Sequence, residues 1–168
     1  MSLINKKAQV VAMDLTLAVA VFAVISVLMI TLWSIYQNRL QDNINNGQIL
    51  NVAFTFSDYL ISNPGKPTNW NSSNVIGIGL ASQDRFISES KLNNLSNISY
   101  NKTKSLFQIN MYNYDYYLLL SNYNLTNPTI YYAYGLPAPN NAKKVIKLRR
   151  YVIYNNDTAT FEVTLWKN

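Results

Sequence analysis

The sequence predicts an α+β fold in which one long N-terminal α-helix packs on a small antiparallel β-sheet head domain. Two observations predict this fold. A long apolar stretch, continued by a helical pattern up to Pro64, fills the first part of the 168-residue chain. The second half is rich in β-branched and aromatic residues, which favour strands. Because an antiparallel sheet needs a cover for its apolar face, we expect the outer half of the helix to supply it.

The first element is an apolar helix with the length of a membrane span. Residues 15–33 carry no charge and would extend about 28 Å as a helix, close to the hydrocarbon thickness of a bilayer. Lys6 and Lys7 precede this stretch, so the positive-inside rule places the N-terminus in the cytoplasm and the rest of the chain outside. Trp33 and Tyr36 stand where an interfacial aromatic belt is expected.

The residues that follow the apolar stretch leave two outcomes open for this helix. A secretory signal peptide is disfavoured, because "WSIYQNRL" offers no small-residue cleavage site. The helix is then either a permanent single-pass anchor or a helix that is retained after a short basic leader is removed.

The segment "KKAQ" before the helix resembles the class III signal peptide of archaeal type IV pilin-like proteins. That pattern has a basic residue, a small residue that is usually Gly, and Gln at the first mature position. The resemblance implies that a prepilin peptidase processes the chain at Lys7, Ala8 and Gln9 and removes residues 1–8. The chain departs from the pattern at Ala8, where Gly is usual, and at Asp14, which is one place later than the acid of many family members.

Asp14 has two open roles. It can stand as an N-cap or interfacial acid at the positive end of the helix dipole, without a partner. The resemblance implies instead a filament-core charge partner, which neutralises the new α-amine of Gln9 on a neighbouring subunit. A carboxylate in an apolar helix bundle is costly unless it is paired, so a partner is expected in that second role.

The helical pattern continues beyond the apolar stretch and is expected to end before Pro64, because proline disfavours helix at the preceding residue. Gly47 is a weak point where a kink is expected. The predicted organisation is a leader at 1–8, a transmembrane or filament-core helix at 9–36, an amphipathic continuation at 37–62 and an extracellular α+β head at 63–168.

Strands are predicted in the second half of the chain, at 113–122, 129–135, 143–155 and 158–167. The last two are joined by "NND", a hairpin signal. In the final strand Phe161 and Val163 alternate with Glu162 and Thr164, which predicts one buried and one mixed face. Short helices or turns are expected at 88–95 and 102–109.

The glycine-rich stretch 63–85 is predicted to be the corner where the helix stops. Its Gly-x-Gly lacks the third glycine of a dinucleotide fingerprint and follows no strand of a βαβ unit. Gly77 and Gly79 are therefore interpreted as positions of close backbone approach, and Trp70 as the residue that pins the loop to the domain.

The same region extends the family resemblance. A Gly-x-Pro-x-x-Trp loop, a short apolar segment and a Ser-x-x-Lys-Leu helix start are similar to a region of archaeal class III signal-peptide proteins: Gly65, Pro67, Trp70, 78–81, Ser88, Lys91 and Leu92. The resemblance implies the lollipop architecture of a pilin and no catalytic residues.

Composition excludes several kinds of chemistry. The chain has no cysteine and no histidine, which removes disulfides, thiolate nucleophiles and histidine bases. Its eight acidic residues are scattered. We therefore expect no enzyme, no cofactor and no metal site. The basic run 143–150 is interpreted as a solvated hairpin face, and nucleic acid is not an expected partner.

Six Asn-x-Ser/Thr acceptors are candidates for N-glycosylation: Asn71, Asn94, Asn97, Asn101, Asn124 and Asn156. Asn71 and Asn156 fall in predicted loops and are the better candidates. The count is modest support for a glycosylated exterior, because asparagine is frequent in this chain.

The sequence thus predicts a structural subunit, major or minor, of an archaeal type IV pilus-like surface filament with a role in adhesion. Its expected partners are identical or related pilin subunits, prepilin peptidase, membrane assembly machinery and, before assembly, the lipid bilayer. The alternative is an uncleaved single-pass membrane protein whose extracellular part binds a partner.

Overall fold

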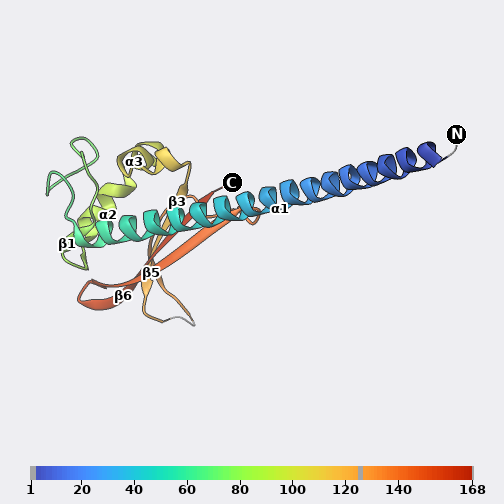
Figure 1. The fold of residues 1–168 in the computed structure, drawn as a ribbon. Coiled ribbons are helices and arrows are strands. Elements are labelled where there is room, and N and C mark those ends of the chain that lie inside the picture. The colour runs from blue at the N-terminus through green and yellow to red at the C-terminus, as the bar shows by residue number, and fades with distance from the viewer. Residues whose placement is uncertain (1–2, 125–126, 168) are drawn as a thin grey trace. The chain divides into compact units, whose positions relative to one another are not determined.

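The computed structural model describes residues 3–124 and 127–167; the side chains of 3–9, 42, 45, 46 and 110 lie outside that description. The predicted α+β class is confirmed: a long N-terminal helix is followed by a curled, mainly antiparallel six-stranded sheet with short helices (Figure 1). The chain divides into two compact units, Met1–Gly47 and Gln48–Asn168. We call the second the compact unit.

Helix α1 spans Leu3–Ser62 and ends two residues before Pro64, as predicted. The helix assignment continues through Gly47, which is also the last residue of the first compact unit, and the kink expected there stays a prediction. Its last turn is closed by the bond from Asn63 N to Tyr59 O at 3.1 Å. The proline ring then prevents a further turn.

The sheet has the strand order β1-β2-β5-β6-β3-β4. The four predicted strands are confirmed to within two residues at either end, and a two-strand ribbon is added before them. The strands are β1 Ala81–Gln83, β2 Phe86–Ile87, β3 Asp115–Asn122, β4 Ile130–Gly135, β5 Lys144–Tyr154 and β6 Asp157–Lys167. Every pairing among the described strands is antiparallel except that of β2 with β5.

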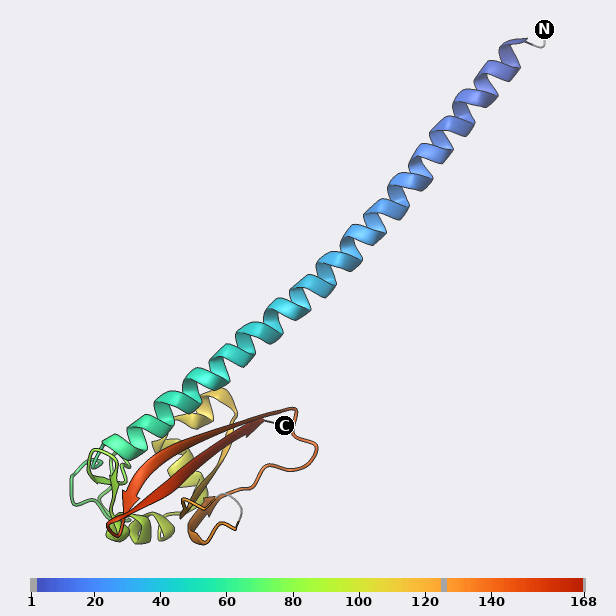
Figure 2. The same cartoon turned by 90° about the horizontal axis from the view of Figure 1, so that it is seen from below.

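Strands β5 and β6 form a long antiparallel hairpin, and Figure 2 shows the two strands side by side. Its two-residue loop is Asn155–Asn156, with φ of 50° and 66°. Asparagine tolerates this left-handed region, and such a loop matches the twist of the flanking strands. The hairpin predicted from "NND" is therefore confirmed.

The core lies between the last turns of α1 and one face of the sheet. Ile49, Ala53 and Leu60 are at most 1% exposed and join one apolar cluster with side chains of β3 and β6. Figures 1 and 2 both show this part of α1 running along the sheet. These helix positions are four and seven residues apart, so they lie on one face of the helix and form one buried stripe.

Two short helices and a 3-10 turn close the core on the side of β4: α2 Glu89–Ser96, α3 Tyr100–Leu106 and η1 Ile109–Tyr112. Tyr116 of β3 is fully buried, with ring centroids 5.7 Å from Phe56, 5.3 Å from Phe107 and 5.0 Å from Tyr100. Its hydroxyl is hydrogen-bonded to Thr103 Oγ1. Burial raises the pKa of Tyr116 well above its usual value, so the ring stays neutral.

The last strand has the buried face that was predicted, with Phe161 and Val163 fully buried, but its second face, which was expected to be mixed, is buried as well. Glu162, Thr164 and Trp166 are only 9%, 3% and 5% exposed, although they point away from the core. The reason is that β6 lies between β5 and β3 in a curled sheet, so neighbouring side chains cover its second face. Lys147 and Arg149 of β5 close over Glu162 at 3.1 and 3.0 Å.

Candidate functional site

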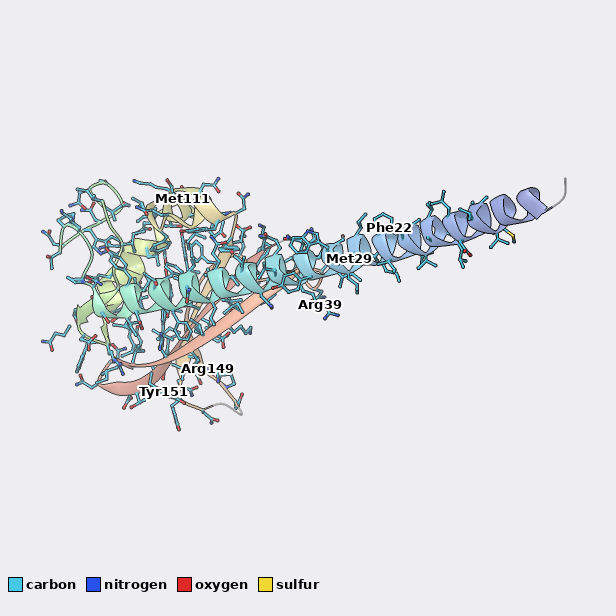
Figure 3. All side chains as sticks on the ribbon, in the orientation of Figure 1. Phe22, Met29, Arg39, Met111, Arg149 and Tyr151 are labelled. Carbon is cyan, nitrogen blue, oxygen red and sulfur yellow. The ribbon has the colours of Figure 1, made fainter. Side chains whose placement is uncertain are left out.

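The apolar part of α1 is long and apolar enough to cross a membrane, as a span or as a signal anchor. The segment Val10–Gln41 has these properties, and its side chains are exposed apart from half-buried Ser26. Figure 3 shows Phe22 and Met29 standing out from this helix. Within one chain, these apolar side chains are therefore left without a cover.

The two threonine hydroxyls of this segment are satisfied inside the helix. Thr16 Oγ1 donates to the carbonyls of Ala12 and Met13 at 3.0 and 2.8 Å, and Thr31 Oγ1 donates to the carbonyl of Val27 at 2.8 Å. A hydroxyl that returns its hydrogen bond to the preceding turn needs no water. These threonines are thus compatible with a lipid or helix-bundle environment.

The predicted processing residues Lys7, Ala8 and Gln9 lie outside the described side chains, so processing stays a prediction. Asp14 is exposed and has no ion-pair partner among the side chains that are described. Its surroundings on the helix, Val10, Met13 and Leu17, are apolar and exposed. A carboxylate there loses its hydration when the helix enters an apolar environment, which favours a partner from another chain.

The glycine-rich stretch is occupied by its own chain, as the sequence predicted. Trp70 is 1% exposed, and its Nε1 donates to the carbonyls of Pro64 and Gly79 at 3.1 and 3.0 Å. A Cβ at Gly79 would lie 2.1 Å from Asn63 O, and one at Gly65 would meet the Trp70 ring at 2.5 Å. Gly65 and Gly79 therefore permit close packing of the loop and leave no cradle for a phosphate. The close backbone approach predicted at Gly77 is wrong, because the nearest backbone atom to a Cβ there would be Lys66 N at 4.0 Å.

Two polar side chains of α2, Lys91 and Asn94, bind this loop, a role that the sequence did not predict for either residue. Lys91 Nζ donates to Pro64 O at 2.5 Å and to Ala81 O at 2.7 Å. Asn94 Nδ2 donates to Trp70 O at 3.0 Å. Burial lowers the pKa of Lys91. The segments of the resemblance that contain Trp70 and Lys91 are thus packed together in one structure.

The predicted glycosylation acceptors differ in access. Asn94 is half-buried and uses its amide nitrogen in the bond to Trp70 O, which makes it a poor acceptor. Asn71, Asn97, Asn101 and Asn156 are exposed. Asn124 is exposed too, but the two residues that complete its acceptor motif lie outside the described residues.

The basic run of β5 is split between the two faces of the sheet. Arg150 points to the core side, where it pairs with Asp58 at 3.0 Å, donates to Ser57 Oγ at 3.3 Å and lies 5.1 Å from the Phe54 ring. Arg149 points to the other side, which Figure 3 shows facing away from α1.

Glu162, which pairs with Lys147 and Arg149 on the outer face, is held in its ionised form. Burial by itself raises the pKa of Glu162, but the hydrogen bonds from Arg149 and Lys147 outweigh burial and hold it below its usual range. The outer face of β5 thus presents partly neutralised rather than continuous positive charge.

A groove of about 600 Å³, which we call the lateral groove, opens on the compact unit. One flank of α1 from Asn51 to Tyr59, the loop at Ile76 and the α3–η1 segment line it, and none of its lining residues is charged. Met111 and Ile76, which are 77% and 69% exposed, are the most exposed large apolar side chains of the described compact unit, and both line this groove. Sequence reasoning missed the groove, because its walls come from three separate segments.

Among the described residues, no group of three or more acidic, cysteine or histidine side chains could hold a metal ion. Comparisons with protein-family models, with curated proteins and with solved structures gave no match for this chain. The class that the fold defines is therefore a protein with one exposed apolar helix and one compact α+β unit.

Proposed function

We propose that the protein is a structural subunit of an archaeal type IV pilus-like surface filament, held in the membrane by its apolar helix before assembly. One observation carries this proposal. Every turn of α1 from Val10 to Gln41 exposes apolar side chains, while the compact unit has a complete core of its own. Such a helix needs lipid or other helices around it, and a bundle of identical helices can replace the lipid.

Asp14 supports assembly over a permanent anchor. A carboxylate among Val10, Met13 and Leu17 is costly in a lipid or helix-bundle core. If residues 1–8 are removed, the α-amine of Gln9 on a neighbouring copy supplies the opposite charge. Removal of the leader therefore creates the partner that Asp14 requires, whereas an uncleaved anchor does not.

The exterior of the compact unit fits a surface role. Tyr123, Tyr131 and Tyr151 are 58%, 45% and 54% exposed, and five of the six glycosylation acceptors are exposed as well. Tyrosine offers apolar contact area together with a hydroxyl, which suits adhesive contacts. This is the basis for proposing a part in attachment for the same subunit, in either a major or a minor position.

The experiment is mass spectrometry of the native N-terminus of the protein from cell-surface material. The expected mature chain begins at Gln9. Lys7→Glu should leave the leader in place, whereas Ala8→Gly, which restores the usual small residue, should be processed at least as completely. A native chain that still begins before Lys6 would overturn the proposal and favour the uncleaved membrane-anchored binding protein.

A further inference from the structure

Three lysines gather at the open end of the β5–β6 hairpin. Lys144 and Lys167 are direct partners in the register of the two strands, and Lys143 N donates to Lys167 O at 3.0 Å. Lys143 and Lys167 are exposed, and Lys144 is half-buried. Like charges directly opposite each other on neighbouring strands are destabilising, so an anion bound here would stabilise this end of the sheet.

The acidic side chains near this end of the sheet are already occupied. Asp115, which begins β3 opposite Trp166 of β6, is paired with Lys104 at 2.7 Å. Glu162 is held by two cations of β5. Among the side chains that the structure describes, no acid is paired with the three lysines. The open end of the hairpin therefore presents positive side chains without a described negative partner.

Aromatic and apolar side chains adjoin these lysines. Lys167 Nζ lies 6.0 Å from the Tyr114 ring, and the Tyr114 ring is stacked on that of Tyr112 at 5.9 Å. Tyr112 is 38% exposed, and Met111, beside it in the chain, is 77% exposed. Lysine, tyrosine and an exposed apolar side chain together are typical of a surface that rests at a membrane interface. We use the name basic end for five residues: Met111, Tyr112, Lys143, Lys144 and Lys167.

The lysines of the basic end lie where α1 enters the compact unit, because β5 runs in the same direction as the part of α1 that packs on it. Arg150 pairs with Asp58 at 3.0 Å. Further along β5, Ile153 N donates to Arg85 O, and Arg85 N donates to Ile61 O, both at 2.8 Å. The first residue of β5 is six positions before Arg150, which places it about 20 Å back toward the entry of α1. Figures 1 and 2 both show the end of β6 there.

Only a short piece of chain separates this entry from the membrane-length segment. That segment ends at Gln41, and the compact unit begins at Gln48, seven positions later. Seven residues extend about 10 Å as a helix and at most about 25 Å when fully stretched. While the apolar segment spans a bilayer, the entry of the compact unit is therefore held within that distance of the end of the span, whatever the arrangement of the two units.

We propose that the basic end binds the anionic headgroups of the same bilayer that holds the apolar helix. The lysines lie against the headgroup phosphates, and Met111 enters the boundary between headgroups and acyl chains. Lysine is attracted to an anionic lipid surface within a Debye length, about 8–10 Å at ordinary ionic strength. The inference rests on the membrane-held state of the proposed function and does not depend on assembly into a filament.

The exposed methionine favours lipid over a soluble polyanion such as nucleic acid. Lysines alone suit either partner, because both present phosphate groups. Met111 gains from leaving water only where an apolar phase lies next to the phosphates, which a bilayer provides and a nucleic-acid backbone does not. The contact holds the compact unit on the membrane surface while the helix remains in the bilayer.

The experiment places a fluorescent label at a single cysteine, because the chain contains none of its own. The full-length protein with Met111→Cys is reconstituted in phosphatidylcholine vesicles with and without phosphatidylglycerol, and quenching by nitroxide-headgroup lipids is measured. The matched control is Phe86→Cys, since Phe86 is an exposed apolar residue that pairs with Ile153, toward the other end of β5. In the anionic vesicles the Met111→Cys label should be quenched severalfold more strongly than the Phe86→Cys label.

Neutralising the lysines tests the part that charge plays. Lys143→Gln with Lys167→Gln should weaken the contact about tenfold or more and lower the quenching of the Met111→Cys label. The matched control is Lys66→Gln with Lys102→Gln, which removes the same charge from two other exposed lysines and should leave the quenching unchanged. Both double variants should keep the thermal unfolding midpoint of the parent, because the replaced side chains are exposed.

Equal quenching of the two labels, or equal quenching of the Met111→Cys label with and without phosphatidylglycerol, would overturn the inference. Equal quenching together with retention of the detergent-solubilised protein on duplex DNA, lost in the Lys143→Gln and Lys167→Gln variant, would assign the basic end to nucleic acid instead.

The same measurements separate this inference from the proposed function. If chains that begin at Gln9 assemble into filaments but the two labels are quenched equally, the lipid contact is wrong and the proposed function stands. If the leader is retained and filaments are absent, yet the Met111→Cys label is quenched as expected, the proposed function fails and the lipid contact is upheld.

Discussion

The two halves of α1 are the instructive comparison in this molecule. Between Val10 and Gln41 the helix exposes its apolar side chains on all sides, whereas from Ile49 onward the same helix places a stripe of them in a closed core. Leu28 is 57% exposed and Leu60 is 0% exposed, although both are leucines in one continuous helix. The second half is stabilised by its own chain. The first half must be stabilised by something outside it, which is what a filament or membrane role requires.

The largest expected effect separates two tryptophans. Trp70→Ala removes a buried ring and its hydrogen bonds to Pro64 and Gly79, and should cost about 3–5 kcal/mol of stability. Trp33→Ala, at an exposed position, should leave the unfolding free energy of the compact unit unchanged. Urea unfolding of the full-length protein in detergent, followed by the circular dichroism of the sheet, measures both. Equal free energies of unfolding for Trp70→Ala and Trp33→Ala would contradict the distinction between a buried and an exposed tryptophan.

The next effect tests the halves of α1 directly. Leu60→Ala should lower the free energy of unfolding by about 2–5 kcal/mol, because it leaves a cavity in the core. Leu28→Ala should change it by less than about 0.5 kcal/mol, and should instead weaken retention in the membrane or filament. Thermal melting beside a membrane-fractionation assay gives both readouts. A fall in the free energy of unfolding for Leu28→Ala as large as that for Leu60→Ala would show that the N-terminal half of α1 is covered by its own chain.

A smaller effect distinguishes adjacent arginines of β5. Arg150→Ala loses contacts to Asp58, Ser57 and Phe54 and should cost about 1–2 kcal/mol. Arg149→Ala should cost no more than about 1 kcal/mol, since Lys147 continues to neutralise Glu162. The two melting curves are compared at low and high salt. A larger loss for Arg149→Ala would contradict the assignment of the two faces.

The smallest effect at neutral pH comes from the buried tyrosines. Burial raises the pKa of Tyr100 and Tyr116, and raises the pKa of Tyr132 to about 12, above the ordinary value of about 10 in the unfolded chain. Below a pH of about 10, these tyrosines keep their protons in both the folded and the unfolded chain, so the free energy of unfolding does not change with pH. Above it the unfolded chain ionises first, so stability should fall as the pH rises from about 10 to about 12. Tyr116→Phe should flatten this decline. Constant stability up to pH 11 would contradict it.

Local signals explain how much of the fold follows from the sequence. The uncharged run, Pro64 after the helix and the turn at Asn155–Asn156 each act within a few residues, and each predicted its element. The close approach at Gly79 and the burial of Trp70 were predicted for the same reason. Such features depend on backbone sterics and side-chain size, which a short stretch of sequence contains.

Features that depend on distant segments could not be predicted. The second buried face of β6 arises only because β3 and β5 flank it in the sheet, so its alternating pattern was misleading. The roles of Lys91 and Asn94 depend on carbonyls of the glycine-rich loop. The lateral groove combines α1, Ile76 and Met111, whose positions meet only in three dimensions. The only sequence signal for the lateral groove was the presence of large apolar residues, Ile76 and Met111, in segments that are otherwise polar.

Electron microscopy of cell-surface filaments, with the chain present and after its deletion, tests the central claim most directly. The account predicts thin filaments that disappear on deletion, with the segment Val10–Gln41 forming a helical bundle along the filament axis. Unchanged filaments after deletion, with the protein remaining as a single uncleaved chain in the membrane fraction, would contradict it.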